Sequence, residues 1–92
     1  MTTDRQSLAQ QAGMLCNLPA FGLYLDARAR RDKGLTVEQL PDGTHNAEDA
    51  ADAVRRACGV GSRADLDHNE QAAAMYKRIV ADFGRWKRRT GL

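Results

Sequence analysis

Residues 70–89 read EQAAAMYKRIVADFGRWKRR, and this stretch decides the fold class. Its large apolar side chains recur every three or four residues, at Met75, Tyr76, Ile79, Phe83 and Trp86. Because an α-helix turns once every 3.6 residues, these side chains would form one stripe along a helix roughly 30 Å long. The stretch holds three of the five aromatic residues, so we expect it to be the spine of the core.

The sequence before this stretch shows the same helical spacing in three shorter segments. Their apolar faces comprise Leu8, Ala12, Leu15 and Cys16, then Phe21, Tyr24 and Leu25 with Arg28 in register, then Ala47, Ala50, Ala51, Val54, Ala57 and Cys58. Sustained two-residue alternation, the pattern of a strand, does not occur. We therefore predict one all-α domain over residues 1–92, a compact bundle of about four helices with a long basic C-terminal helix.

Capping residues place the ends of these helices. Thr3 with Gln6 and Asp67 with Glu70 have the spacing of capping boxes, and a third helix would open after Thr44 or Asn46. Pro19 suits a first helical turn, whereas Gly34 and Gly59 suit helix ends, and Ser62 with Asp65 would cap a short turn. The least regular stretch is residues 35–46, where Thr36 to Gln39 would cap one turn and Pro41-Asp42-Gly43 predicts a tight turn. A short strand pair near residues 35–45 is compatible with it.

Size and composition argue for a small binding protein rather than an enzyme. A chain of 92 residues has little room for both a core and a deep substrate cleft. Cys16 and Cys58 match no metal-binding or redox spacing, so we expect buried free thiols, with a disulfide as the alternative. No segment approaches the ~20 apolar residues of a membrane span. We expect a cytoplasmic protein without a cofactor.

Charge is distributed unevenly, and this asymmetry bears on partners. Between Gly34 and Val54 there are five acids and no Lys or Arg, which would suit a basic partner, or simply a solvated face with capping residues. Two basic clusters lie elsewhere, at the end of the second helix and along the last one. We predict that they bind a partner: Arg30, Arg31, Lys33, Lys77, Arg78, Arg85, Lys87, Arg88 and Arg89. The alternative is a solvated face whose cations compensate the helix dipole.

Single residues of chemical interest each have a structural alternative. Trp86 lies among basic residues, where it would stack on a nucleobase or enter a partner pocket, but its register also suits the core. Ser62 with Arg63 would form at most a small anion site, since the P-loop ending and the preceding strand are missing. His45 and His68 lack the converging ligands of a zinc site. We assign no catalytic and no metal-binding residue.

Two segments carry a resemblance to a family. The stretch Cys58-Gly59-Val60-Gly61-Ser62-Arg63-Ala64-Asp65-Leu66-Asp67 before a basic aromatic helix, and Met14-Leu15-Cys16 followed by Phe21 and Leu25, resemble small phage and prophage proteins. Some helical phage proteins of this size are anti-CRISPR inhibitors. The resemblance implies a protein that binds a type I CRISPR surveillance complex and blocks its access to target DNA. It transfers no site residue, because the shared positions are caps and core.

Two functions remain open. One is a non-enzymatic stoichiometric inhibitor that docks on a host protein or ribonucleoprotein complex by charge complementarity. The other is a small accessory protein of phage replication, recombination or regulation that binds DNA or RNA directly. This second function requires the two basic clusters on one face and predicts affinity that falls steeply with salt. For either function we expect a host-cytoplasmic protein that does not bind membranes, as a monomer or a weak homodimer.

Overall fold

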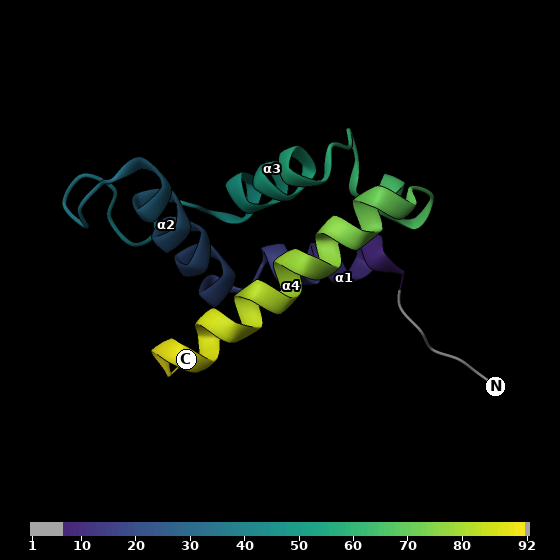
Figure 1. Cartoon of the computed structure of the whole chain (residues 1–92). Coiled ribbons are helices and arrows are strands. Elements are labelled where there is room, and N and C mark those ends of the chain that lie inside the picture. Colours follow the sequence, from purple (N-terminus) through teal and green to yellow (C-terminus); the bar gives the residue numbers. More distant parts are fainter. Residues whose placement is uncertain (1–6, 92) are drawn as a thin grey trace.

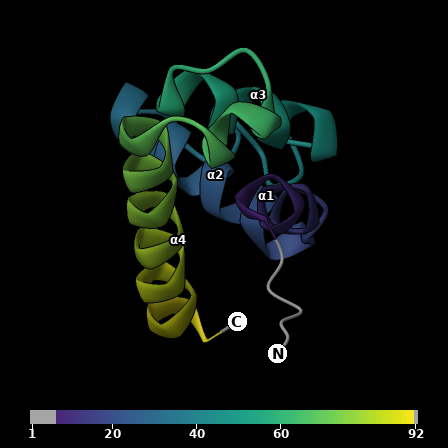
Figure 2. The same ribbon diagram turned by 90° about the vertical axis from the view of Figure 1, so that its right-hand side faces the viewer.

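The computed structural model describes residues 7–91, and helices dominate this part of the chain. In chain order they are α1 (Leu8–Cys16), α2 (Pro19–Lys33), α3 (Ala47–Cys58), the short 3-10 helix η1 (Arg63–Asp67) and α4 (Glu70–Thr90). Figure 1 shows α2 and α3 on one side of α4, and Figure 2 shows α1 and α4 on two sides of the molecule with α3 at the top. The predicted all-α bundle is confirmed.

The core lies where α1, α2, α3 and η1 meet the inner face of α4. Its largest buried side chains include Phe21, Tyr24, Leu66, Tyr76 and Phe83. Small residues allow close approach, since Ala12, Ala50 and Ala72 are fully buried. The buried positions on α4 follow helical spacing, as the sequence predicted. Both cysteines are free, Cys16 buried and Cys58 half-buried.

Most helix ends carry the signals that the sequence placed there. Asn46 caps α3 in a capping box with Asp49, and Gly34 and Gly59 end α2 and α3 in the left-handed conformation that glycine adopts without strain. The box proposed for Thr3 and Gln6 lies outside the described residues. Ser7 with Gln10 forms a capping box that opens α1.

The capping role predicted for Asp67 is wrong, and the reason is a distant contact. Asn69 caps α4, its side chain accepting a hydrogen bond from the backbone N–H of Ala72. The carboxylate of Asp67 instead accepts hydrogen bonds from the backbone N–H groups of Leu8 and Ala9, at 2.8 and 3.3 Å. A negative charge there favours the positive end of α1 and ties it to η1.

The strand pair considered near residues 35–45 does not form. Thr36 and Gln39 exchange hydrogen bonds across one turn, and the backbone of Thr44 donates to Pro41 to close another, as predicted for both segments. Between residues 7 and 91 the chain contains no strand. Most side chains of this α2–α3 loop are exposed, so it lacks the apolar face that would hold a strand pair against the core.

Candidate binding surface between α2 and α4

Four aromatic rings fix how α2 and α4 sit against each other. The ring of Phe21 meets Phe83 edge-on at 5.3 Å between centroids, and Tyr24 meets Trp86 at 5.8 Å. Phe83 and Trp86 also stack, with centroids 6.3 Å apart. Aromatic pairs at these separations attract each other through their quadrupoles as well as by burying area. The two helices therefore hold a defined spacing at the edge of the core.

A polar network lies directly outside this aromatic cluster, centred on Asp82. The Tyr24 hydroxyl donates to Asp82 at 2.6 Å, and Arg28 donates to the Tyr24 oxygen at 3.1 Å. Arg28 and Arg85 also form ion pairs with Asp82, at 3.5 and 3.3 Å. The Tyr24 hydrogen bond, with help from both arginines, holds the pKa of Asp82 below its usual value. Asp82 is therefore ionised at neutral pH.

Arginines from both helices gather on the solvent side of Asp82. Arg28 and Arg31 of α2 line one hollow with Arg78 and Arg85 of α4, and an adjoining hollow with Arg89. We call these five residues the arginine surface. Arg85 and Arg89 follow Arg78 by seven and eleven residues, which are close to two and three whole turns, so the three side chains share one face of α4. Five permanent positive charges thus gather around Asp82, with Asp32 beside Arg31 at the edge of the surface.

Two arginines of the arginine surface form no ion pair or hydrogen bond with the described residues. Within the described part of the chain, the guanidinium groups of Arg78 and Arg89 have no ion-pair or hydrogen-bond partner. The only ion pair of Arg31 is with its neighbour Asp32, at 3.9 Å, and its side chain is 67% exposed. An exposed pair of this kind contributes little, so all three side chains remain available to an anion.

The structure brings together only part of the predicted site. Arg31, Arg78, Arg85 and Arg89 belong to the arginine surface, and Arg28 joins them although it was not among the predicted binding residues. Arg30 points elsewhere: it donates to the backbone oxygen of Leu40 at 2.7 Å, pairs with Asp42 at 3.1 Å and is only 17% exposed. It fixes the α2–α3 loop to α2, so we leave it out of the surface.

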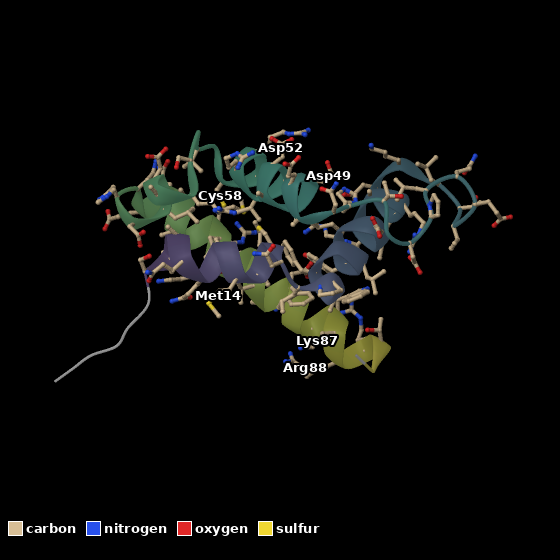
Figure 3. All side chains as sticks on the ribbon, turned by 180° about the vertical axis from the view of Figure 1, so that it is seen from behind. Met14, Asp49, Asp52, Cys58, Lys87 and Arg88 are labelled. Carbon is tan, nitrogen blue, oxygen red and sulfur yellow. The ribbon has the colours of Figure 1, made fainter. Side chains whose placement is uncertain are left out.

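The other predicted cations lie on different parts of the molecule. Lys33 lines another hollow, which runs from Arg28 of the arginine surface to His45 and residues of α3. The Lys87 ammonium lies 5.9 Å from the Phe83 ring, and Lys77 and Arg88, eleven residues apart, share the outer face of α4. Figure 3 shows Lys87 and Arg88 at one edge of the molecule and Asp49 and Asp52 of α3 at the opposite edge.

Acidic residues concentrate on α3, but basic neighbours offset part of their charge. Glu48, Asp49 and Asp52 line a polar hollow together with Arg55 and Arg63. Asp52 forms ion pairs with Arg55 and Arg56, and the hydrogen bond from Arg56 is the main cause that lowers its pKa. The α3 part of the predicted acidic stretch is thus a mixed-charge face rather than a purely acidic one.

Sequence reasoning missed the most buried polar group of the described chain. Asp26 of α2 is fully buried and accepts hydrogen bonds from the backbone N–H groups of Gly43 and His45, at 2.8 and 3.0 Å. The Nδ1 atom of His45 lies 2.6 Å from the same carboxylate. One turn earlier, Gly22 gives the loop room, because a Cβ there would lie 2.7 Å from the His45 carbonyl oxygen. Asp26 therefore anchors the α2–α3 loop.

Metal and redox chemistry find little support in this geometry. Across residues 7–91, no group of three or more His, Cys, Asp or Glu side chains is arranged to hold a metal ion. Burial raises the pKa of the Cys16 and Cys58 thiols, which disfavours the reactive thiolate. None of the described helices is long and apolar enough to cross a membrane.

Comparison with known proteins gives no relative from which a role could be transferred. No protein-family model, no curated protein and no solved structure matches the chain.

Proposed function

We propose that this is a non-enzymatic nucleic-acid-binding protein that holds the sugar–phosphate backbone of DNA or RNA on its arginine surface. The observation that carries the proposal is the convergence of Arg28 and Arg31 with Arg78, Arg85 and Arg89 across two helices. Arginine keeps its charge at every physiological pH and offers a planar fork of donors that matches phosphate oxygens.

The length of the surface suits a nucleic-acid strand. Arg78 and Arg89 are eleven residues apart, which is roughly 16 Å along a helix at 1.5 Å per residue. A strand in a duplex carries one phosphate per roughly 3.4 Å of axis, so α4 spans about five phosphates. A protein partner would need a row of carboxylates of similar length to match this face. The repeating backbone of a nucleic acid supplies such a row of negative charges.

The positive charge that Asp82 leaves uncompensated also favours a polyanionic ligand. Asp82 compensates Arg28 and Arg85 but leaves Arg31, Arg78 and Arg89 without a strong partner. Bringing phosphates to these three releases condensed counterions from the nucleic acid, which is the main source of non-specific affinity. We expect binding to depend steeply on salt and weakly on sequence.

The direct test is fluorescence anisotropy with labelled single-stranded and duplex DNA between 50 and 200 mM salt. The double variant Arg78→Ala/Arg89→Ala should weaken binding and reduce the slope of log K against log salt by roughly 1.4–1.8, the contribution of two phosphate contacts. The charge-matched control Lys33→Ala/Lys87→Ala should keep the wild-type slope. Absence of binding by the wild type at 50 mM salt would refute the proposal, as would equal losses in the two double variants.

A second candidate function is a phage-encoded, anti-CRISPR-like inhibitor that binds a host type I surveillance complex. The observation that favours it is that surfaces of different charge lie at opposite edges in Figure 3, the mixed-charge face of α3 with Asp49 and Asp52 at one and Lys87 and Arg88 of α4 at the other. A ribonucleoprotein complex offers surfaces of both signs, and charge complementarity steers docking. Binding to a purified surveillance complex, with loss of its binding to target DNA, would support this function; unimpaired DNA binding at a stoichiometric excess would exclude it.

A further inference from the structure

The smaller of the two hollows in the arginine surface has an aromatic wall. Its volume is about 170 Å³, and it lies between α2 and α4. Tyr24 and Trp86 line it together with Arg28, Arg31 and Arg89. Aromatic and cationic side chains in one small hollow are the combination that single-stranded nucleic-acid-binding proteins use, with bases on the rings and phosphates on the cations.

The indole of Trp86 is held firmly yet is not enclosed. It stacks against Phe83 and meets Tyr24 edge-on, so its orientation is set by the core. Its side chain is nonetheless only partly buried, because it also lines the hollow. Trp86 thus packs at the edge of the core, as its register suggested, and also presents part of its side chain to the hollow. A ring fixed in place loses little conformational freedom when a second ring stacks on it.

Resting on the proposed function, we propose that this hollow is a base-stacking subsite and that the protein takes single-stranded nucleic acid in preference to duplex. One unpaired base enters the hollow and stacks on Trp86. Arg31 and Arg89, on opposite helices, hold the phosphates on its two sides. Arg89 lies one turn after Trp86 on α4, so the stacking ring and a phosphate-binding fork share one face.

Duplex nucleic acid can use this subsite only at a cost in free energy. Its bases are paired and stacked inside the helix, so a base reaches Trp86 only if it is flipped out. A duplex would keep the phosphate contacts and lose the stacking contact. The preference for a single strand should therefore arise from Trp86, whereas the salt dependence arises from the arginines.

Trp86 is the only tryptophan of the chain, which makes its emission a direct probe. We would titrate the protein with three 12-mers at one salt concentration, reading affinity from the anisotropy of a terminal label and stacking from the Trp86 emission with unlabelled copies: oligo-dT, its duplex with oligo-dA, and an abasic strand of equal charge. Oligo-dT should quench the emission and bind at least about fivefold tighter than the other two, the lower end of what base–aromatic stacking contributes. The abasic strand and the duplex should bind without comparable quenching.

Variants at position 86 complete the test. Trp86→Leu, which removes the aromatic face, should lose the preference for oligo-dT over its duplex, while Trp86→Phe should retain most of it. If Trp86→Leu does not fold, the three titrations of the wild type still decide whether a base stacks on Trp86. Equal affinity for all three 12-mers without quenching would overturn the stacking subsite and leave the proposed function standing. Failure to bind any of them would overturn both.

Discussion

Replacing Asp26 with Asn keeps the shape of a fully buried side chain and removes its charge. Both carboxylate oxygens are in use: one accepts from the His45 backbone and contacts the His45 ring, and the other accepts from Gly43. An asparagine offers one acceptor oxygen, and its NH₂ group would face an N–H donor on one side. At least one hydrogen bond is lost, and a partly buried donor is left without an acceptor.

The cost follows from these contacts. A hydrogen bond to a charged group contributes about 1.5–3 kcal/mol, and an unsatisfied buried donor costs about 1–3 kcal/mol. Since the loop is exposed and relaxes in part, we expect Asp26→Asn to lower the free energy of unfolding by about 2–4 kcal/mol. For a domain of this size each kcal/mol corresponds to roughly 4–8 °C in Tm. The melting temperature should therefore fall by at least about 8 °C.

Urea and thermal unfolding followed by circular dichroism at 222 nm would measure the change. The matched control is Asp32→Asn on the same helix, whose carboxylate is exposed and makes only a 3.9 Å pair with Arg31. It should change stability by less than about 0.5 kcal/mol. A loss below about 1 kcal/mol for Asp26→Asn, or equal effects of the two variants, would refute the assignment of Asp26 as the anchor of the α2–α3 loop.

Three further predictions concern binding, pH and backbone packing. Asp82→Asn should tighten DNA binding about fivefold at low salt, because a charge pair near 4 Å in water is worth about 1 kcal/mol. Fluorescence anisotropy measures the affinity. Unchanged or weaker binding would argue against the idea that Asp82 competes with phosphate for Arg28 and Arg85. Burial raises the pKa of Tyr76, so its contribution to stability is complete below about pH 10 and declines as pH rises through the raised value. Melting curves from pH 9 to 11.5 should show a shallower alkaline decline for Tyr76→Phe, and parallel declines would contradict this. Gly22→Ala should lower the free energy of unfolding by about 1–3 kcal/mol, because the added Cβ would lie 2.7 Å from the His45 carbonyl oxygen. Gly84→Ala, whose Cβ has its nearest contact at 3.7 Å, should raise it by up to about 1 kcal/mol. Urea unfolding of both variants measures the difference, and similar effects would count against the close approach at Gly22.

The sequence predicted the helices well because their signals are local. Helical spacing identified the buried face of α4, and the left-handed glycines Gly34 and Gly59 end α2 and α3 where expected. The cap of α4 was misplaced because the Asp67 carboxylate bonds to the backbone of Leu8, 59 positions away. Capping rules examine neighbours in sequence and do not detect a competing partner from another element.

The site was predicted only in part, since it depends on contacts between distant residues. Arg30 and Arg31 are adjacent in sequence, yet one fixes the loop and the other faces solvent, a difference set by where Leu40 lies. The gathering of Arg28 with α4 follows from the aromatic packing of the two helices. One available signal was overlooked: Asp26 follows Gly22 by one turn, and an acid and a glycine at that spacing suit the close approach of a polar loop.

The most direct test of the arginine surface is an NMR titration of ¹⁵N-arginine-labelled protein with oligo-dT, following the side-chain Nε–Hε signals. Phosphate binding changes the environment of each guanidinium that it touches. We predict that the largest shifts occur at Arg31, Arg78 and Arg89, with smaller shifts at Arg28 and Arg85 as they exchange Asp82 for phosphate. Shifts confined to the arginines of α3 and η1, or none at saturating oligonucleotide, would contradict the assignment of this surface.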